Sequence, residues 1–366
     1  MEQRQQLEPA APPGAEQQVE HVEELTDEQA EQRLSIGSRL SDWRTILSFA
    51  VAIALFVGIF IKAGIDPVAM WHRLRTINLG LFLCAFVVYY LTFPLRGIRW
   101  KWLLQNAYKD EGNKAVDDMS IKGLTEIIYI SWFVNCIVPA KLGDLYRAYL
   151  AKLWAQISWT KTVGTVLAER ILDILVLSLL FAATGFLVFH DRLGHVSWIL
   201  LLGIGLAVLG IAALVAMKAL GPRIRAVLPE RFRDRYTAFE DGTLNSFRRL
   251  PLLLAVTCLI WLLEGGRFQF VFLALGIQTH VSSRIPFAPM LFFALGTAVL
   301  TTLPFTPGGL GLVEALLGSL LIYLGIPKSD AIAVVVVDRL LSYYSIAFFG
   351  FLVYLLSKRS HFRHPV

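Results

Sequence analysis

The stretch Leu303–Glu314, which reads LPFTPGGLGLVE, decides the fold because it interrupts one of the most apolar regions of the chain. Pro304 and Pro307 each remove a backbone hydrogen-bond donor and disfavour helix in the residue before them. The three glycines that follow allow tight turns and close backbone approach. Irregular backbone at membrane depth is tolerated only inside protein or beside a wet cavity, and transporters place substrate sites at such breaks. We therefore interpret the rest of the chain as a scaffold around this break.

The composition indicates the solvent in which this scaffold folds. The chain has 366 residues, of which 56% are hydrophobic and 17% charged, with a mean hydropathy of +0.59. Soluble domains carry about 25% charged residues, whereas several apolar runs here approach the roughly 20 residues that span a bilayer. The sequence therefore predicts an all-α, polytopic integral membrane protein, with about seven transmembrane helices and two re-entrant helical hairpins.

The chain divides into three predicted parts. Residues 1–44 are acidic and predict a disordered cytoplasmic tail, residues 45–357 form the transmembrane domain, and residues 358–366 form a basic cytoplasmic tail. The predicted spans are 46–64, 77–95, 162–189, 198–220, 251–275 and 331–356.

Two regions have apolar arms that are too short to span a bilayer comfortably. In the first, an arm over 124–138 ends at Pro139–Asp144 and a second arm runs to about Trp154. In the second, arms over 287–302 and onward to Leu324 flank the central break. Both patterns predict re-entrant hairpins. A surface helix pair joined by an ordinary turn is the alternative for the first region.

The net charge of +6 is carried by basic residues in short loops. This favours contact with anionic lipid over a nucleic-acid partner. Basic residues concentrate at 96–122, at 221–250 and in the C-terminal tail, and the positive-inside rule makes these segments and the N-terminus cytoplasmic. We expect a multi-pass protein of the cytoplasmic (inner) membrane, whose first hairpin enters from the cytoplasm and whose second enters from outside.

A weak internal repeat agrees with this topology. Pro139-x-x-x-Gly143 and Pro304-x-x-x-Gly308 are each followed by an acidic residue and, later, by an arginine. Inverted repeats with the substrate site at their interface are a common transporter plan. Chance similarity in a chain rich in glycine, proline and leucine is the competing explanation.

Charged side chains at membrane depth cost at least ~2.5–3.5 kcal/mol each, so those retained in the apolar runs are candidates for function. Glu169 and Asp173 share a helix face at i,i+4, and Glu264 and Arg267 do so at i,i+3. Such residues either neutralise one another as buried pairs that fix helix register or line a substrate path, and we expect the path. The predicted substrate-binding residues are Lys141, Asp144, Arg147, Glu169, Arg170, Asp173, Glu264, Pro304, Pro307, Gly308, Gly309, Glu314, Asp338 and Arg339.

A basic and aromatic segment follows the second predicted span. Arg96, Arg99 and Lys101 are interleaved with Trp100 and Trp102. Arginine, lysine and tryptophan are typical of membrane–water boundaries. We therefore expect these side chains at the rim of the membrane, with a polar loop after them.

The candidate residues indicate a type of ligand. The second arm of each hairpin begins near mid-membrane, so its N-terminal N–H groups favour an anion. Arginine supplies forked positive charge suited to phosphate, while the carboxylates can meet a cationic group. These features predict a site for an anionic or zwitterionic lipid head group. No nucleotide-binding loop and no His/Cys cluster with metal spacing occur in the sequence, so we expect no cofactor and no bound metal.

Three motifs in chain order carry a family resemblance. They are PAKLGDLYR at Pro139–Arg147, ERILD at Glu169–Asp173 and PFTPGGLGLVE at Pro304–Glu314, and an Asp338-Arg339 pair follows them. Their combination resembles the lysylphosphatidylglycerol synthase transmembrane region, a flippase-like family, over residues 45–357. The resemblance implies translocation of a lipid between leaflets.

Members of that family differ in what accompanies the membrane region. In bifunctional members a separate soluble C-terminal domain makes aminoacylated phosphatidylglycerol, and other members are linked to polyprenyl-phosphate sugars and glycosylation. This chain ends at Val366, so we expect no synthase activity. Lys141 and Asp144 stand where other members often have Arg and Glu, and the charges are thus kept.

We predict lipid translocation (flippase-like) of an anionic or zwitterionic phospholipid or a polyprenyl-phosphate-linked lipid. One alternative is a membrane-embedded glycosyl or lipid transferase with Glu169 and Asp173 as its acid–base pair. Another is a non-transporting partner subunit of envelope lipid or glycan assembly. The expected partners are the membrane lipid substrate, the bilayer and envelope or glycosylation enzymes. The lipid, the direction of movement and the oligomeric state stay open at this point.

Overall fold

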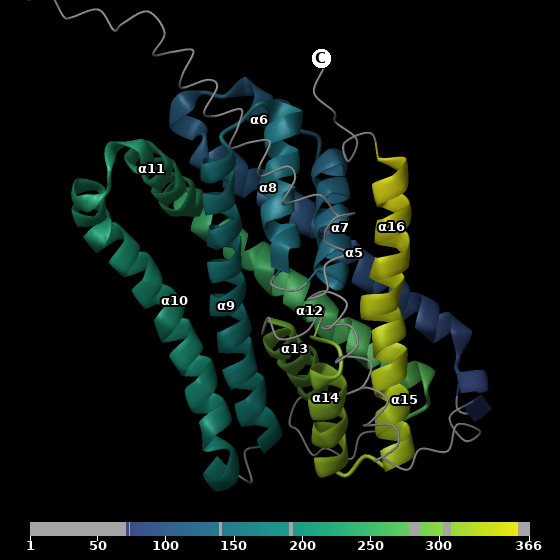
Figure 1. The fold of residues 1–366 in the computed structure, drawn as a ribbon. Coiled ribbons are helices and arrows are strands. Elements are labelled where there is room, and N and C mark those ends of the chain that lie inside the picture. The colour runs from purple at the N-terminus through teal and green to yellow at the C-terminus, as the bar shows by residue number, and fades with distance from the viewer. Residues whose placement is uncertain are drawn as a thin grey trace, which may run out of the picture.

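The computed structural model of the chain describes residues 71–72, 74–138, 141–189, 193–277, 286–302 and 309–357. Every regular element in these residues is a helix, and none is a strand (Figure 1). The expected span at 46–64 and the expected tails at 1–44 and 358–366 lie outside the described residues. The protein is an all-α membrane protein, as the sequence predicts.

Five helical stretches in the described part are long and apolar enough to cross a membrane. They are Leu79–Ala107, Trp159–Phe189, Leu201–Val227, Glu230–Ala274 and Lys328–Leu356. The first two are α5 (Leu79–Ala107) and α9 (Trp159–Phe189), and the third lies in α10 (Leu193–Val227). The fourth joins α11 (Glu230–Leu244), η4 (Asn245–Arg249) and α12 (Leu250–Ala274). The fifth joins α15 (Lys328–Arg339), η6 (Leu340–Tyr344) and α16 (Ser345–Leu356).

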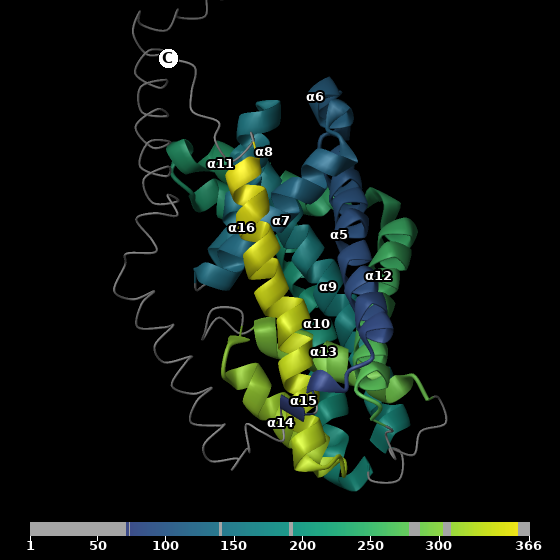
Figure 2. The same ribbon diagram turned by 90° about the vertical axis from the view of Figure 1, so that its right-hand side faces the viewer.

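Four shorter helices form two pairs at opposite ends of the bundle. The helices α7 (Ile121–Ile137) and α8 (Leu142–Ala155) lie in the half drawn at the top of Figure 1. The helices α13 (Ala288–Thr302) and α14 (Leu312–Tyr323) lie in the lower half, as Figure 2 also shows. The upper end also carries η1 (Lys109–Glu111), α6 (Lys114–Asp118) and α11. The short arms predicted from the sequence are therefore present, while their entry into a bilayer from opposite faces stays a prediction.

The first pair, α7 and α8, is held together by its own polar groups. Ser120 caps α7, since its Oγ accepts a hydrogen bond from the Gly123 N–H at 3.1 Å. α7 ends at Ile137, and the proline at position 139 disfavours helix in the residue before it. Asn135 of α7 accepts a hydrogen bond from the Gly143 N–H of α8 at 2.9 Å. A donor that the start of α8 leaves unpaired is thereby satisfied by α7.

Glycines set the spacing of several helices. A Cβ at position 143 would lie 2.0 Å from the Ser131 carbonyl oxygen, so α7 and α8 touch through their backbones. A Cβ at Gly164 of α9 would lie 2.4 Å from the Phe239 carbonyl oxygen of α11. Small residues at helix contacts are the usual means of close packing in membranes, where lipid tails are as apolar as leucine.

The segments expected as basic loops are largely helical, and those two predictions are wrong. α5 continues to Ala107 because Trp100, Leu103 and Leu104 extend its apolar buried face past the arginines. α10 likewise extends to Val227, and α11 and η4 fill most of the remainder up to residue 249. Basic residues in the sequence therefore marked helix surfaces and interiors as well as loops.

The last span contains a π turn, η6, between α15 and α16. A π turn frees backbone carbonyls, and its occurrence inside a helix is often functional. The Tyr89 hydroxyl of α5 donates to the Ser342 carbonyl at 2.9 Å. The Tyr343 hydroxyl, from the π turn itself, donates to the Cys136 carbonyl in the last turn of α7 at 2.8 Å. The last span thus connects α5 with the inner end of the first short pair.

We predict that Gly143→Ala destabilises the protein by about 1–3 kcal/mol, because the new methyl group would overlap the backbone of α7. Gly205→Ala is the matched control, since a Cβ there meets nothing within 4 Å. Alanine also has the higher helix propensity, so the control should be neutral or slightly stabilising. The measurement is thermal unfolding of each purified variant in detergent. Equal midpoints for Gly143→Ala and the wild type would contradict the close contact of α7 and α8.

Candidate functional site: a buried charge network

Arg99 of α5 is the centre of a buried cluster of charges, and its side chain has no exposed surface. Its guanidinium donates to Asp173 at 2.6 Å and to Glu169 at 2.7 Å. It also donates to the Thr257 hydroxyl of α12 at 2.9 Å. Glu169 and Asp173 are one turn apart on α9, so a single planar fork reaches both carboxylates. Three helices therefore meet at one guanidinium.

The first short pair joins this cluster through Glu169. Its second oxygen accepts a hydrogen bond from Arg147 of α8 at 2.8 Å. The Arg147 guanidinium also lies over the Trp100 ring, 5.0 Å from its centroid, and its Nη2 has no hydrogen-bond partner among the described residues. Asp144, one turn earlier on α8, is 3.9 Å from Arg147. The carboxylate of Glu169 thus ties α8 to α9 and α5.

Arg170 and Lys141 occupy the more open side of the cluster. The Arg170 side chain is 30% exposed and lies 3.4 Å from Asp144, 3.5 Å from Glu169 and 3.6 Å from Asp173. Lys141 is half-buried at the start of α8, with its backbone in the left-handed conformation at φ 53°. It lies within electrostatic range of Arg170 and Asp144 but forms no ion pair with the described residues.

A second group of charges lies one helical turn away along α5. Arg96 is 3.3 Å from Glu264 of α12 and stacks over the Trp132 ring at 4.8 Å. Glu264 is also 3.1 Å from Arg267, which donates a hydrogen bond to Asp338 of α15. Since Arg96 and Arg99 are three residues apart on one helix, the two groups are neighbours.

The network reaches the second short pair through Arg339. Arg339, next to Asp338 in the chain, lies 2.9 Å from Glu314 of α14. Glu314 also accepts a hydrogen bond from the Gly311 N–H at 2.6 Å and so caps the start of α14. Gly309 and Gly311 have φ values of 73° and 82°, which favour glycine. The carboxylate at the start of the second pair is thus fixed by both backbone and charge.

Within the described residues the network contains equal numbers of arginines and carboxylates. The arginines are Arg96, Arg99, Arg147, Arg170, Arg267 and Arg339, and the carboxylates are Asp144, Glu169, Asp173, Glu264, Glu314 and Asp338. These side chains come from α5, α8, α9, α12, α14 and α15. Ion pairs join these side chains into three groups, which follow one another along α5 and at the neighbouring residues Asp338 and Arg339.

The sequence identified most of this network. Glu264 pairs with Arg267, as their spacing predicted, Glu169 and Asp173 share one face of α9 and the counter-ion Arg99, and Asp338 and Arg339 are fully or almost fully buried. Pro304, Pro307 and Gly308 lie outside the described residues. Gly309 is described but belongs to the backbone turn before α14.

The expected position of Arg96 and Arg99 is wrong. Both are 3% exposed or less and therefore face the protein interior instead of the surrounding lipid and water. Their charge suggested an interface, but their i,i+3 spacing between apolar residues was the signal of a buried helix face. Arg267, which the sequence only paired with Glu264, is also a full member of the network.

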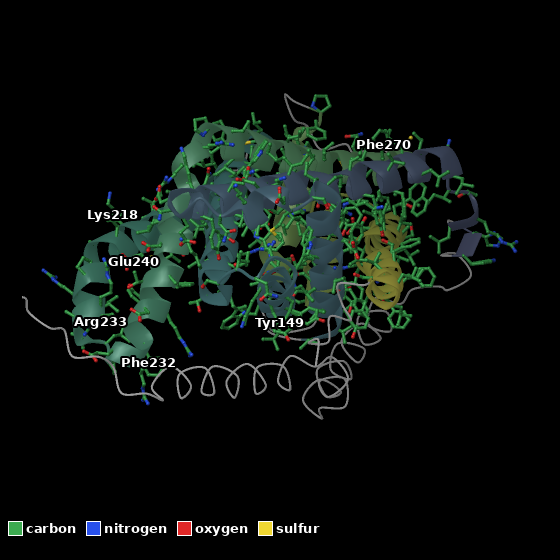
Figure 3. The ribbon with its side chains drawn as sticks, turned by 90° about the horizontal axis from the view of Figure 1, so that it is seen from above. Tyr149, Lys218, Phe232, Arg233, Glu240 and Phe270 are labelled. Carbon is green, nitrogen blue, oxygen red and sulfur yellow. The ribbon has the colours of Figure 1, made fainter. Side chains whose placement is uncertain are left out.

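A separate set of polar contacts fastens the upper end of the bundle. Arg248 donates to Asp110 at 2.8 Å, and this contact holds the pKa of the Asp110 carboxyl below its usual range. The Tyr108 hydroxyl donates to the Ser158 carbonyl at 3.0 Å, and burial raises its pKa to about 12. Figure 3 shows a further group of polar residues, including Arg233 and Glu240, at the outer edge formed by α10 and α11. These contacts serve as controls because they lie away from the network.

Comparison with known sequences agrees with this arrangement. A sequence model of the family described as "Lysylphosphatidylglycerol synthase TM region" matches residues 46–350. The chain belongs to this family. The match includes every residue of the charge network.

Relatives of this chain include archaeal membrane proteins. A UPF0104 membrane protein of Methanocaldococcus jannaschii is 31% identical over 242 residues, which are 64% of this chain and 97% of the relative. A UPF0104 membrane protein of Pyrococcus horikoshii is 23% identical over 314 residues, 77% of this chain and 88% of the relative. The protein named glycosyltransferase AglD of Haloferax volcanii is 26% identical over 322 residues, 77% of this chain but 49% of the relative.

We predict that Arg99→Gln destabilises the protein by about 3–5 kcal/mol, because Glu169 and Asp173 would lose their shortest ion pairs while buried. Arg248→Gln, which breaks the exposed pair with Asp110, should leave stability nearly unchanged. The free energy of unfolding of both variants is measured in detergent under the same conditions. Similar losses for the two variants would contradict the central role of Arg99.

Proposed function

We propose that the protein translocates an anionic or zwitterionic lipid between the leaflets of the cytoplasmic membrane. The substrate is a phospholipid or a polyprenyl-phosphate-linked lipid. The observation that carries the proposal is the charge network, whose ion-paired groups follow one another from the first short helix pair to the second, joined along α5 and through the neighbouring residues Asp338 and Arg339. The head group of the lipid would move along this network while the hydrocarbon chains of the lipid stay in the bilayer.

The energetics of head-group movement support this assignment. A charged group in hydrocarbon is costly unless counter-charges accompany it. A row of alternating arginines and carboxylates offers a partner to a phosphate and to a cationic group alike. Since each member already has a counter-ion, binding a head group exchanges one ion pair for another and avoids a bare charge.

The two short pairs supply the ends of this proposed path. In Figures 1 and 2, α7 ends and α8 begins about half-way along the long helices, and α14 lies in the other half of the bundle. The upper end carries Lys109, Lys114 and the arginines of α11, which favours the cytoplasm by the positive-inside rule. We therefore assign α7 and α8 as a re-entrant hairpin from the cytoplasm and α13 and α14 as one from outside.

A second candidate function is transfer of a sugar or lipid group. It is favoured by the similarity to the relative named glycosyltransferase AglD. The acid–base pair suggested for it is Glu169 and Asp173, which are 1% and 6% exposed and both bound to Arg99. Carboxylates held as counter-ions are poorly placed to move protons. Transfer of label from a nucleotide sugar to polyprenyl phosphate, lost in Asp173→Asn, would favour this second function.

We predict that the purified protein accelerates leaflet exchange in liposomes. The assay compares head-group-labelled phosphatidylglycerol, aminoacyl-phosphatidylglycerol and polyprenyl phosphate with empty liposomes. Arg170→Ala and Glu314→Gln should each slow exchange by about tenfold or more, which equals a rise of about 1.4 kcal/mol in the barrier. Arg170→Ala removes the exposed cation, and Glu314→Gln leaves Arg339 without its carboxylate.

Arg248→Ala is the control for this assay and should exchange lipid like the wild type, since Arg248 lies outside the network. Thermal unfolding of each variant separates lost activity from lost folding. Exchange no faster than in empty liposomes for all three lipids would reject the translocation function. It would leave the transferase or a partner subunit of envelope lipid or glycan assembly.

A further inference from the structure

The arginines of the network differ in the number and length of their hydrogen bonds. Arg99 makes four hydrogen bonds to Asp173, Glu169 and Thr257, at 2.6 to 3.2 Å. Arg147 makes a hydrogen bond of 2.8 Å to Glu169. Arg170 makes one within the described residues, at 3.5 Å to Glu169, and its Nε has no hydrogen-bond partner. Three carboxylates surround Arg170, yet they hold it by charge with little hydrogen bonding.

Exposure distinguishes Arg170 in the same way. Its side chain is 30% exposed, whereas those of Arg99 and Arg147 are 0% and 2% exposed. A guanidinium with open N–H groups has hydrogen-bond donors available, and leaving them unmet is costly. Arg170 is therefore the arginine of this cluster that can take a further acceptor without unfolding the core.

Lys141 adds an unbalanced positive charge beside Arg170. The arginines and carboxylates of the network are equal in number, and Lys141 has no ion pair or hydrogen bond among the described residues. Its left-handed backbone fixes it at the start of α8, in the turn of the first hairpin. The region around Lys141 and Arg170 thus carries one positive charge more than it carries negative.

We propose that Arg170 and Lys141 form an exchangeable phosphate site in which Asp144 is the resident counter-ion. The inference rests on the proposed function and names the residues that take the phosphate of its substrate. A phosphate binds across the Arg170 fork and receives the Lys141 ammonium as a point charge. Asp144 gives up its 3.4 Å contact with Arg170 and remains beside Arg147. No covalent bond changes in this step.

Competition from Asp144 helps the site release phosphate during transport. A site that bound phosphate tightly would retain it, while a site with a competing carboxylate releases it. Asp144 is suited to this because its side chain is 14% exposed and contacts both Arg147 and Arg170. It also lies in the first turn of α8, where a negative charge is favoured by the helix dipole. Removing this carboxylate should therefore strengthen phosphate binding.

The test measures binding to the full-length protein in detergent, without any transport step. The probes are short-chain phosphatidic acid and phosphatidylglycerol, inorganic phosphate, and a neutral short-chain diacylglycerol. Asp144→Asn should lower the Kd for the phosphate lipids by about threefold to tenfold, because a competing charge is gone. Arg170→Gln should raise it by about tenfold to a hundredfold and Lys141→Gln by about threefold to tenfold, since charge-assisted hydrogen bonds are lost.

The controls separate the site from general effects. Arg248→Gln should bind as the wild type does, and diacylglycerol should bind equally to all variants. Binding of inorganic phosphate that follows the same order of variants identifies the phosphate as the recognised group. Binding confined to the lipids, in the same order, identifies a lipid head group as the source of the phosphate.

Two results would overturn the site. One is weaker or unchanged phosphate binding in Asp144→Asn when its unfolding midpoint matches the wild type. The other is binding that Arg170→Gln and Lys141→Gln leave unchanged. If binding follows the expected order but the protein exchanges no lipid between leaflets, the site stands and the translocation function alone fails.

Discussion

A guanidinium in the hydrocarbon of a membrane is stable only beside carboxylates, and the rest of this fold follows from that constraint. Arg99 satisfies it with two acids of α9 and a hydroxyl of α12, so three helices are fixed at one point. Apolar packing gives such helices little preference for one partner face over another, because lipid competes for the same surfaces. Ion pairs therefore decide which helix faces meet, and close glycine contacts allow the backbones to approach.

The same constraint gives the two short helix pairs different roles. The first contributes Asp144 and Arg147 to the network, and its two helices are held together through Gly143 and Asn135. The second contributes a carboxylate, Glu314, whose other oxygen caps its own helix. The first pair thus brings charges of both signs, including the half-buried Lys141 at the start of α8, while the second brings an acid. The proposed inverted repeat would therefore be one of backbone shape more than of charge.

Hydropathy predicted the helical class, the long spans and the two short pairs, because apolar runs of fixed length have few other solutions in a bilayer. Spacing along one helix predicted the partnership of Glu169 with Asp173, because both residues lie on the same element. The sequence could not reveal Arg99 as their counter-ion, since that contact joins residues about seventy positions apart. Charge alone was misleading for Arg96 and Arg99. An arginine at a membrane boundary and an arginine in a buried ion pair look the same in the sequence.

The π turn in the last span sets the rotational orientation of α16, the helix that follows it. Each residue of an α-helix turns the chain by about 100°, so one additional residue in a turn presents a different face downstream. Gly350 of α16 meets the Phe133 side chain of α7, where a Cβ would lie at 2.6 Å. The π turn holds one residue more than an α turn, so the number of residues between Arg339 and Gly350 sets which face of α16 meets the first short pair. The length of this stretch is consequently as constrained as its composition.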